Sequence, residues 1–173
     1  TQKECANIHA QVAPEWIKHN ELIEQFKNLD PNTNEAGIAL LTKALECCER
    51  AKGYCETILK DIASKKPIKQ KDAWCRLVEH TCLQDKNKLE AEIRELQKAL
   101  KSVRSCIAFR QANALYQESS QKAALAEVKR QGCQRTLQDV DAAVVTLYEA
   151  AGLYAEAASA AREALALISP YAD

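Results

Sequence analysis

Eight cysteines carry most of the possible chemistry in this sequence of 173 residues. They stand at Cys5, Cys47, Cys48, Cys55, Cys75, Cys82, Cys106 and Cys133. Thiols at this density either form disulfides in an oxidising compartment or act as small buried apolar residues in a reducing one. Their spacing disfavours zinc, because helical residues seven apart are separated by about 10 Å in rise while all ligands of one zinc ion lie about 2.3 Å from it. We therefore expect disulfides and no metal site.

Two cysteine pairs fit one antiparallel helical hairpin. In such a hairpin, the numbers of residues at the same level have a constant sum, because each step up one helix is a step down the other. Cys48 with Cys82 and Cys55 with Cys75 both give 130. Since helical periodicity also assigns Cys48 and Cys55 to the core, the sequence predicts two disulfides across this hairpin.

The other four cysteines are paired by position and by elimination. Cys106 and Cys133 lie at equal distances from Ser119-Ser120, so a turn at these serines would bring them together. Cys5 is then left to fold back to Cys47. The alternative for all eight residues is that they are unbonded thiols in an apolar core.

No other residues have the types and spacing of a catalytic or cofactor site. None of the three histidines stands in a motif with a nucleophile or a metal ligand: His9, His19 and His80. The four glycines are too scattered for a phosphate-binding loop: Gly37, Gly53, Gly132 and Gly152. Neighbouring carboxylates such as Glu90 and Glu92 are typical of solvated helix faces. We therefore expect no catalytic residue, no cofactor and no enzymatic activity.

The composition is that of long helices. Only 4 Gly and 4 Pro interrupt the chain, and aromatic residues make up 5% of it, while Ala, Leu, Glu, Lys and Gln dominate. The 24 basic residues equal the 24 acidic ones, so the net charge favours neither nucleic acid nor an anionic membrane as a partner. No apolar run approaches the roughly 18 residues of a membrane-spanning helix, so we expect no transmembrane segment.

The first half of the chain is expected to contain a short helix and a long one. Residues 1–13 show no periodicity and are predicted to form an irregular arm. A short helix is predicted over residues 14–28, because Pro14 suits a first helical turn. A long helix is predicted over residues 34–63, where core residues recur at steps of three, four and seven. They are Ile38, Leu41, Leu45, Cys48, Cys55, Leu59 and Ile62.

Two further long helices are predicted over residues 71–117 and 121–168, with a turn at Ser119-Ser120. The second of them has apolar residues at two seam positions of a heptad. They are Leu137, Val140, Val144, Leu147, Ala151, Tyr154, Ala158, Ala161, Leu165 and Ile168. The alternative is a turn after Gly132, with Thr136 and Asp139 as a capping box. The third helix would then be a spine with the second and fourth helices on opposite halves of it.

Together these elements predict an all-α fold. We expect one domain over residues 1–173, an elongated antiparallel bundle of three long helices plus a short N-terminal helix, stapled by disulfides. One local stretch resembles the second half of a tetratricopeptide repeat. It comprises Tyr148, Gly152, Leu153, Tyr154, Ala157, Ala161, Ala164, Leu165 and Pro170. Its proline is one residue late and no second copy stands upstream, and an uninterrupted heptad accounts for the same alanines.

These observations favour a non-enzymatic secreted or cell-surface protein that binds another macromolecule, as a receptor-like or virulence-associated module. Bundles of this kind resemble elongated coat proteins and receptors of protozoan parasites. The alternative is an intracellular, cytoplasmic coiled-coil or tetratricopeptide-like adaptor or assembly subunit with reduced cysteines, able to form a homo-oligomer. A protein partner is expected in both cases. The expected interaction surface comprises Leu100, Val103, Ile107, Val140, Lys65, Lys66 and Lys69.

Overall fold

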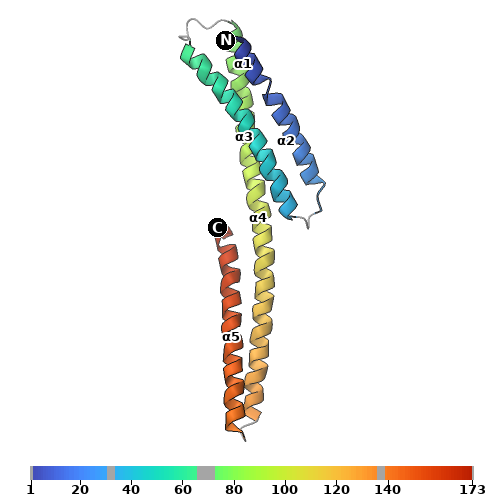
Figure 1. The fold of residues 1–173 in the computed structure, drawn as a ribbon, viewed down its shortest axis with the longest axis vertical. Helices are drawn as coiled ribbons and strands as arrows, with labels where there is room; N and C mark the ends of the chain where they lie inside the picture. Colours follow the sequence, from blue (N-terminus) through green and yellow to red (C-terminus); the bar gives the residue numbers. More distant parts are fainter. Residues whose placement is uncertain (1, 31–33, 66–72, 136–138, 173) are drawn as a thin grey trace. The chain divides into compact units, whose positions relative to one another are not determined.

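The structure is a computed structural model that describes residues 2–30, 34–65, 73–135 and 139–172 (Figure 1). Within these ranges the chain is helical, with no strand, which confirms the all-α prediction. The elements are α1 (Gln2–His9), α2 (Val12–Lys27), α3 (Asn34–Lys65), α4 (Ala73–Arg135), α5 (Val140–Ile168) and the short 3-10 helix η2 (Ser169–Tyr171).

The helices group into two compact units, where the sequence predicts one bundle domain over residues 1–173. Unit 1 is Thr1–Arg104 and unit 2 is Ser105–Asp173. The helix α4 contributes its first part to unit 1 and its last part to unit 2.

Unit 1 has a core built on α3. Its largest fully buried side chains include Leu41 and Ile58 of α3 and Leu89 of α4. The predicted helix over residues 34–63 is confirmed, because α3 spans Asn34–Lys65. Small residues on the same face, such as Ala44 and Ala51, are also completely buried, so α3 presents a wider apolar face than the predicted stripe.

The N-terminal segment is helical, so the predicted irregular arm over residues 1–13 is wrong. Cys5 of α1 and Val12 of α2 are buried, and Ile8 packs against the same core. These three residues are spaced by three and four, which is helical spacing over too short a stretch to stand out in the sequence. The predicted helix over residues 14–28 corresponds to α2, which begins two residues earlier.

The predicted turn at Ser119-Ser120 is also wrong, because α4 runs without a break through both serines to Arg135 and is 63 residues long. The helices predicted over residues 71–117 and 121–168 are therefore replaced by α4 and by α5. Serine has only a mild preference against helix interiors, so two serines do not end a helix whose neighbours favour it. The alternative of one long third helix was the better one, although Gly132 lies inside α4.

Unit 2 is an antiparallel pair formed by the last part of α4 and by α5. The first turn of α5 is capped by Asp139, whose side chain accepts a hydrogen bond from the Ala142 backbone N–H. Residues 136–138, including Thr136 of the predicted capping box and Leu137, lie outside the described residues. The stretch that resembles half of a tetratricopeptide repeat lies mainly within α5, which is one continuous helix.

Candidate functional site

None of the eight cysteines forms a disulfide, so the predicted staples are wrong. The Cys55 thiol is hydrogen-bonded to Cys82 rather than bonded to Cys75. Facing residues of α3 and α4 therefore share a sum of 137 instead of the predicted 130, a shift of one heptad. Because a heptad pattern repeats every seven residues, this shift keeps every core position in the core, and periodicity alone does not distinguish the two registers. Cys48 consequently does not meet Cys82.

The two other predicted pairs fail for reasons of distance along a helix. Cys106 and Cys133 both belong to α4, where 27 residues span roughly 40 Å. Cys5 donates a hydrogen bond to Asp61 Oδ2 over 3.7 Å. Asp61 is 14 residues from Cys47 along α3, or roughly 21 Å, so Cys5 cannot reach Cys47.

The buried thiols behave as apolar core groups. Burial raises the pKa of Cys48 to about 12, with Glu92 adding to the effect. Hydrogen bonding between Cys55 and Cys82 raises the pKa of Cys82 and lowers that of Cys55. A thiol must lose its proton to act as a nucleophile or a metal ligand, and Cys48 and Cys82 keep theirs at neutral pH. Across the described ranges, no three His, Cys, Asp or Glu residues are grouped so that they could hold a metal ion.

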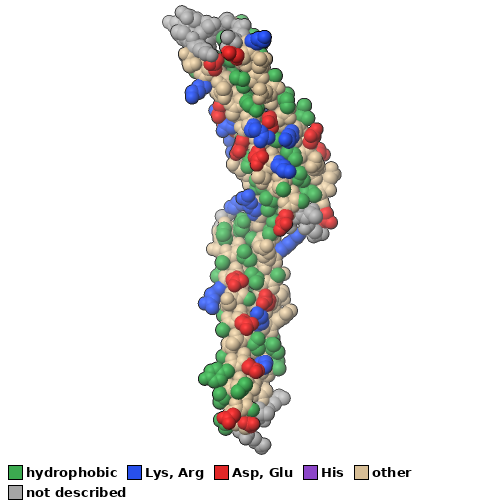
Figure 2. Space-filling model, viewed as in Figure 1, with side chains coloured by type: hydrophobic (Ala, Val, Ile, Leu, Met, Phe, Trp, Pro, Cys, Tyr) green, Lys and Arg blue, Asp and Glu red, His purple; other side chains and the backbone are tan. Residues whose placement is uncertain are grey.

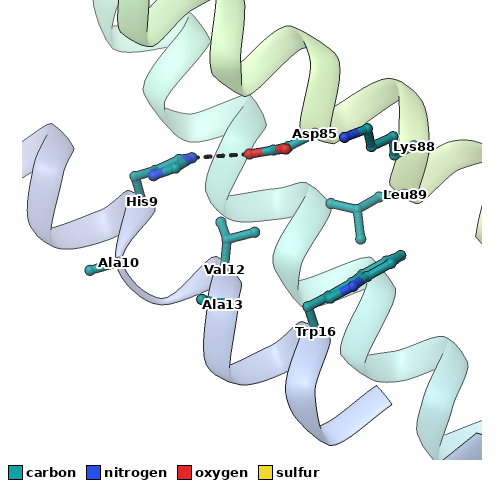
Figure 3. A pocket seen from close by; sticks show the side chains of 8 residues that line it. All are labelled: His9, Ala10, Val12, Ala13, Trp16, Asp85, Lys88 and Leu89. Atoms are coloured by element: carbon teal, nitrogen blue, oxygen red, sulfur yellow. Dashed lines mark hydrogen bonds and ion pairs between the residues drawn. The ribbon is translucent and has the colours of Figure 1, made fainter. Parts of the chain in front are cut away.

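A pocket of about 380 Å³ lies where α1 and α2 meet α4 (Figure 3). Its floor is apolar, with Trp16 of α2 and Leu89 of α4 reaching toward each other and Val12 beside them. At its edge His9 of α1 and Asp85 of α4 form an ion pair of 3.1 Å between Nε2 and Oδ2. A pocket of this size and lining can hold a small apolar group with a polar end.

The His9–Asp85 pair resembles two members of a catalytic triad but lacks the third. A nucleophile would have to be hydrogen-bonded to the imidazole. Cys5 lines a second, neighbouring pocket of about 280 Å³ together with His9, but its thiol donates to Asp61 instead. The arrangement therefore fits a packing contact between α1 and α4.

His19 is a buried polar residue that was not predicted to lie in the core. It is 3% exposed and stacks on Trp16 with 5.0 Å between ring centroids. Its Nε2 atom lies 3.2 Å from Glu92 Oε1, without the alignment of a hydrogen bond. The sequence contained a sign of this burial, because Val12, Trp16 and His19 are spaced so that they lie on one side of a helix.

The strongest candidate for a binding surface is in unit 2, on one flank of α5. We call the nine apolar residues that were predicted to form the seam of this helix the α5 stripe. They are Val140, Val144, Leu147, Ala151, Tyr154, Ala158, Ala161, Leu165 and Ile168. All but Ile168 are exposed, with Val140 at 70% and Leu165 at 65%. Hydrophobic side chains reach the surface of this unit in Figure 2 as well.

The prediction that the α5 stripe packs within the chain is therefore wrong, and alanines occupy the seam instead. The buried alanines are Ala143, Ala150, Ala157, Ala160 and Ala164 on α5 and Ala108, Ala112 and Ala126 on α4. Ser119 Oγ donates to the Ala157 carbonyl over 2.8 Å, and Cys133 Sγ donates to that of Ala143 over 3.2 Å. Side chains of α4 thus bond to the backbone of α5, which only small seam residues permit.

Polar contacts lie beside the α5 stripe, and Tyr154 of the stripe takes part in one of them. Lys122 pairs with Glu156 across the two helices at 3.0 Å, on the side of α5 away from the stripe. Tyr154 donates its hydroxyl to Glu127 over 2.8 Å, and the hydrogen bonds from Arg130 lower the pKa of Glu127 to about 2. Since Arg130 also bonds to Glu127, it lies on the same flank as Tyr154. Phe109 and Tyr116 precede Arg130 by multiples of seven, so these exposed residues of α4 lie on that flank as well.

The other residues of the predicted interaction surface have different environments. Leu100 is buried at 6% exposure and Val103 packs against the core of unit 1, so neither is available to a partner. Ile107 is half-buried, whereas Val140 is exposed. Lys65 is the last residue of α3, and Lys66 and Lys69 lie outside the described residues.

Comparison with known proteins gives no relative: no family model, curated protein or solved structure matches the chain. The helices within the described ranges include none that is both long and apolar enough to cross a membrane.

Proposed function

We propose that this protein is a non-enzymatic interaction module that binds another macromolecule through the α5 stripe. The observation that carries the proposal is that nine successive heptad positions of α5 are apolar, and eight of them are exposed. Large contiguous apolar patches on soluble proteins mark interaction sites. Heptad spacing is the pattern with which one helix packs along another.

We further propose that it acts as an adaptor or assembly subunit with reduced cysteines. The expectation of a secreted or cell-surface receptor depended on the disulfide ladder, and the cysteines are thiols. Cys47, Cys48, Cys55 and Cys82 are at most 1% exposed and lie among apolar side chains, where cysteine serves as a small apolar residue. The secreted location remains a prediction that no contact supports.

Photo-crosslinking tests this function at neighbouring positions of one helix. Benzoylphenylalanine would replace Val144, in the stripe, or Val145, which is 58% exposed and points away from both stripe and seam. We expect irradiation of cells that produce the protein to give a discrete adduct from position 144 and little from position 145. Equal yields from both positions, or no adduct from either, would contradict the proposal, whatever the partner is.

A further inference from the structure

We propose that the occupant of the α5 stripe is the α5 stripe of a second copy, packed antiparallel about a two-fold axis. This inference depends on the proposed function, since it names the partner of the same surface. A two-fold dimer requires a self-complementary surface, in which residue i contacts residue j and j contacts i. The side-chain sizes and the flanking charges of the stripe are self-complementary. Its area is also large enough for a stable dimer.

The sizes of the side chains match in one register. In antiparallel helices packed through heptad positions, facing residues again share a constant sum, here 305. Leu147 then faces Ala158 of the second copy, and Val144 faces Ala161. Tyr154 faces Ala151, and only Val140 and Leu165 meet as two large residues near the ends. Alternation of large and small residues across an interface is what close packing requires.

The charges beside the stripe match in the same register. The heptad position next to the stripe is occupied by Asp141, Tyr148, Ala155 and Arg162. In the antiparallel arrangement, positions of this kind lie opposite each other. Asp141 of one copy therefore lies near Arg162 of the second copy, and symmetry gives two such ion pairs in each dimer. A register shifted by one heptad would lose both pairs.

The area is sufficient for a stable dimer. The 29 residues of α5 span roughly 43 Å at 1.5 Å per residue. Two helices side by side are roughly 20 Å wide, and α4 adds Phe109 and Tyr116 to this flank. The flank therefore covers roughly 850 Å², close to the ~800 Å² that each partner contributes to a standard-size interface.

Sedimentation equilibrium of the full chain tests whether a second copy binds. We expect a mass of twice 19.2 kDa at micromolar concentrations. Val144→Lys should weaken the dimer at least ~10-fold, because a charged group enters each half of an apolar interface. The matched variant Val145→Lys should leave dimerisation unchanged. Circular dichroism should show the same helix content in both variants, since both residues are exposed.

Charge reversal tests the register and is insensitive to misfolding. Asp141→Arg alone and Arg162→Asp alone should each weaken the homodimer ~10-fold, because two attractive pairs become repulsive. When the two variants are mixed, the heterodimer regains two opposite-charge pairs. We therefore expect a 1:1 complex, resolved by native mass spectrometry, to exceed both homodimers.

The outcomes separate this inference from the proposed function. The chain could stay monomeric when its concentration is raised ~100-fold and still give a crosslinked adduct with another protein from position 144. This result would overturn the proposal that the partner is a second copy, and it would leave the proposed interaction module intact. A dimer that is equally sensitive to Val144→Lys and Val145→Lys places the dimer contact elsewhere. Absence of preferential heterodimers overturns the register.

Discussion

Unit 1 encloses a core of large apolar side chains, whereas unit 2 buries mainly alanines and leaves many of its large apolar side chains at the surface. Leu41, Ile58 and Leu89 are at most 2% exposed in unit 1, while Leu165 and Tyr148 of unit 2 are 65% and 76% exposed. The numbers of helices explain this contrast. In unit 1, three helices and part of α4 surround a common core, but two helices have only one line of contact and cannot enclose a large side chain.

This difference assigns different tasks to the two units. The core side chains of unit 1 already have partners within the chain and therefore stabilise the fold. Those of the α5 stripe contribute little to the stability of an isolated chain, because water still covers them. Burial of these side chains would stabilise a complex, because they leave water only when a partner binds. Substitutions in the two units should therefore separate effects on stability from effects on binding.

The largest expected effect is the loss of a large core side chain in unit 1. Ile58→Ala should reduce the free energy of unfolding by ~3 kcal/mol, because Ile58 is completely buried and a cavity would remain. Val145→Ala in unit 2 should change it by less than ~0.5 kcal/mol. Urea unfolding followed by tryptophan fluorescence measures the first change, since Trp16 and Trp74 both lie in unit 1. Equal losses in the two variants would remove the contrast between the units.

A second test enlarges a seam residue of unit 2. Ala157 is 5% exposed, and its carbonyl accepts the hydrogen bond from Ser119. Ala157→Leu should destabilise the pair of helices by ~2 kcal/mol, because the extra atoms force α4 and α5 apart. Ala166→Leu, at an exposed position of α5, serves as the matched control. Urea unfolding monitored by far-ultraviolet circular dichroism should detect the loss, and a neutral Ala157→Leu would show that the seam is not tightly packed.

The sequence predicted the heptad spacing along each helix well. It predicted poorly which side of α5 packs against α4. Along α5 the heptad was correct, but its large members were assigned to the seam because apolar size is the usual sign of burial. The alanines one position away carry a weaker signal, and only the absence of enclosing helices makes them the better seam. A single sequence also does not distinguish an apolar face that packs within the chain from one that packs against another chain.

The register between helices was the other limit of the sequence. The core positions of α3 were predicted correctly around Cys48, Cys55 and Ile62, yet the partner of Cys55 was displaced from Cys75 to Cys82. Two cysteine pairs readily share the same sum of residue numbers when the cysteines of each helix lie seven residues apart, as Cys48 and Cys55 do on α3 and Cys75 and Cys82 do on α4. The pocket at His9 was not predicted because it requires α1, which was expected to be irregular.

The third prediction concerns the buried thiols. Cys48 is 1% exposed in unit 1, whereas Cys106 at the start of unit 2 is exposed. Cys48→Ser should destabilise the protein by ~1–2 kcal/mol, because a hydroxyl has a larger desolvation cost than a thiol. Cys106→Ser should be neutral.

Alkylation of the native protein checks the same difference without substitution. Iodoacetamide should modify Cys106 first, and the pKa of about 12 at Cys48 should make that thiol unreactive until unfolding. After unfolding without reductant, all eight cysteines should react, and a smaller number would indicate disulfides. Prior reduction should leave the unfolding midpoint unchanged.

The smallest expected effect is that of an ion pair between α2 and α3. Arg50 donates two hydrogen bonds of 2.9 Å to the two carboxylate oxygens of Glu15, which lowers the pKa of Glu15. A carboxyl whose pKa is lower in the folded state stabilises the fold above its unfolded pKa of about 4.3. This contribution is lost as pH falls through the lower, folded value. Since the Arg50 side chain is 44% exposed, we expect less than ~1 kcal/mol.

Glu15→Gln should therefore cost more stability near neutral pH than in acid, because the contribution of the ionised carboxyl is lost as pH falls through its lowered pKa. The matched control is Glu24→Gln, which removes the ion pair with Lys27. Both residues of that pair lie in α2, so the pair does not connect two helices. Both residues are in unit 1, so tryptophan fluorescence in urea follows both variants. A pH-independent difference for Glu15→Gln would show that the arginine holds the carboxyl too weakly to affect the fold.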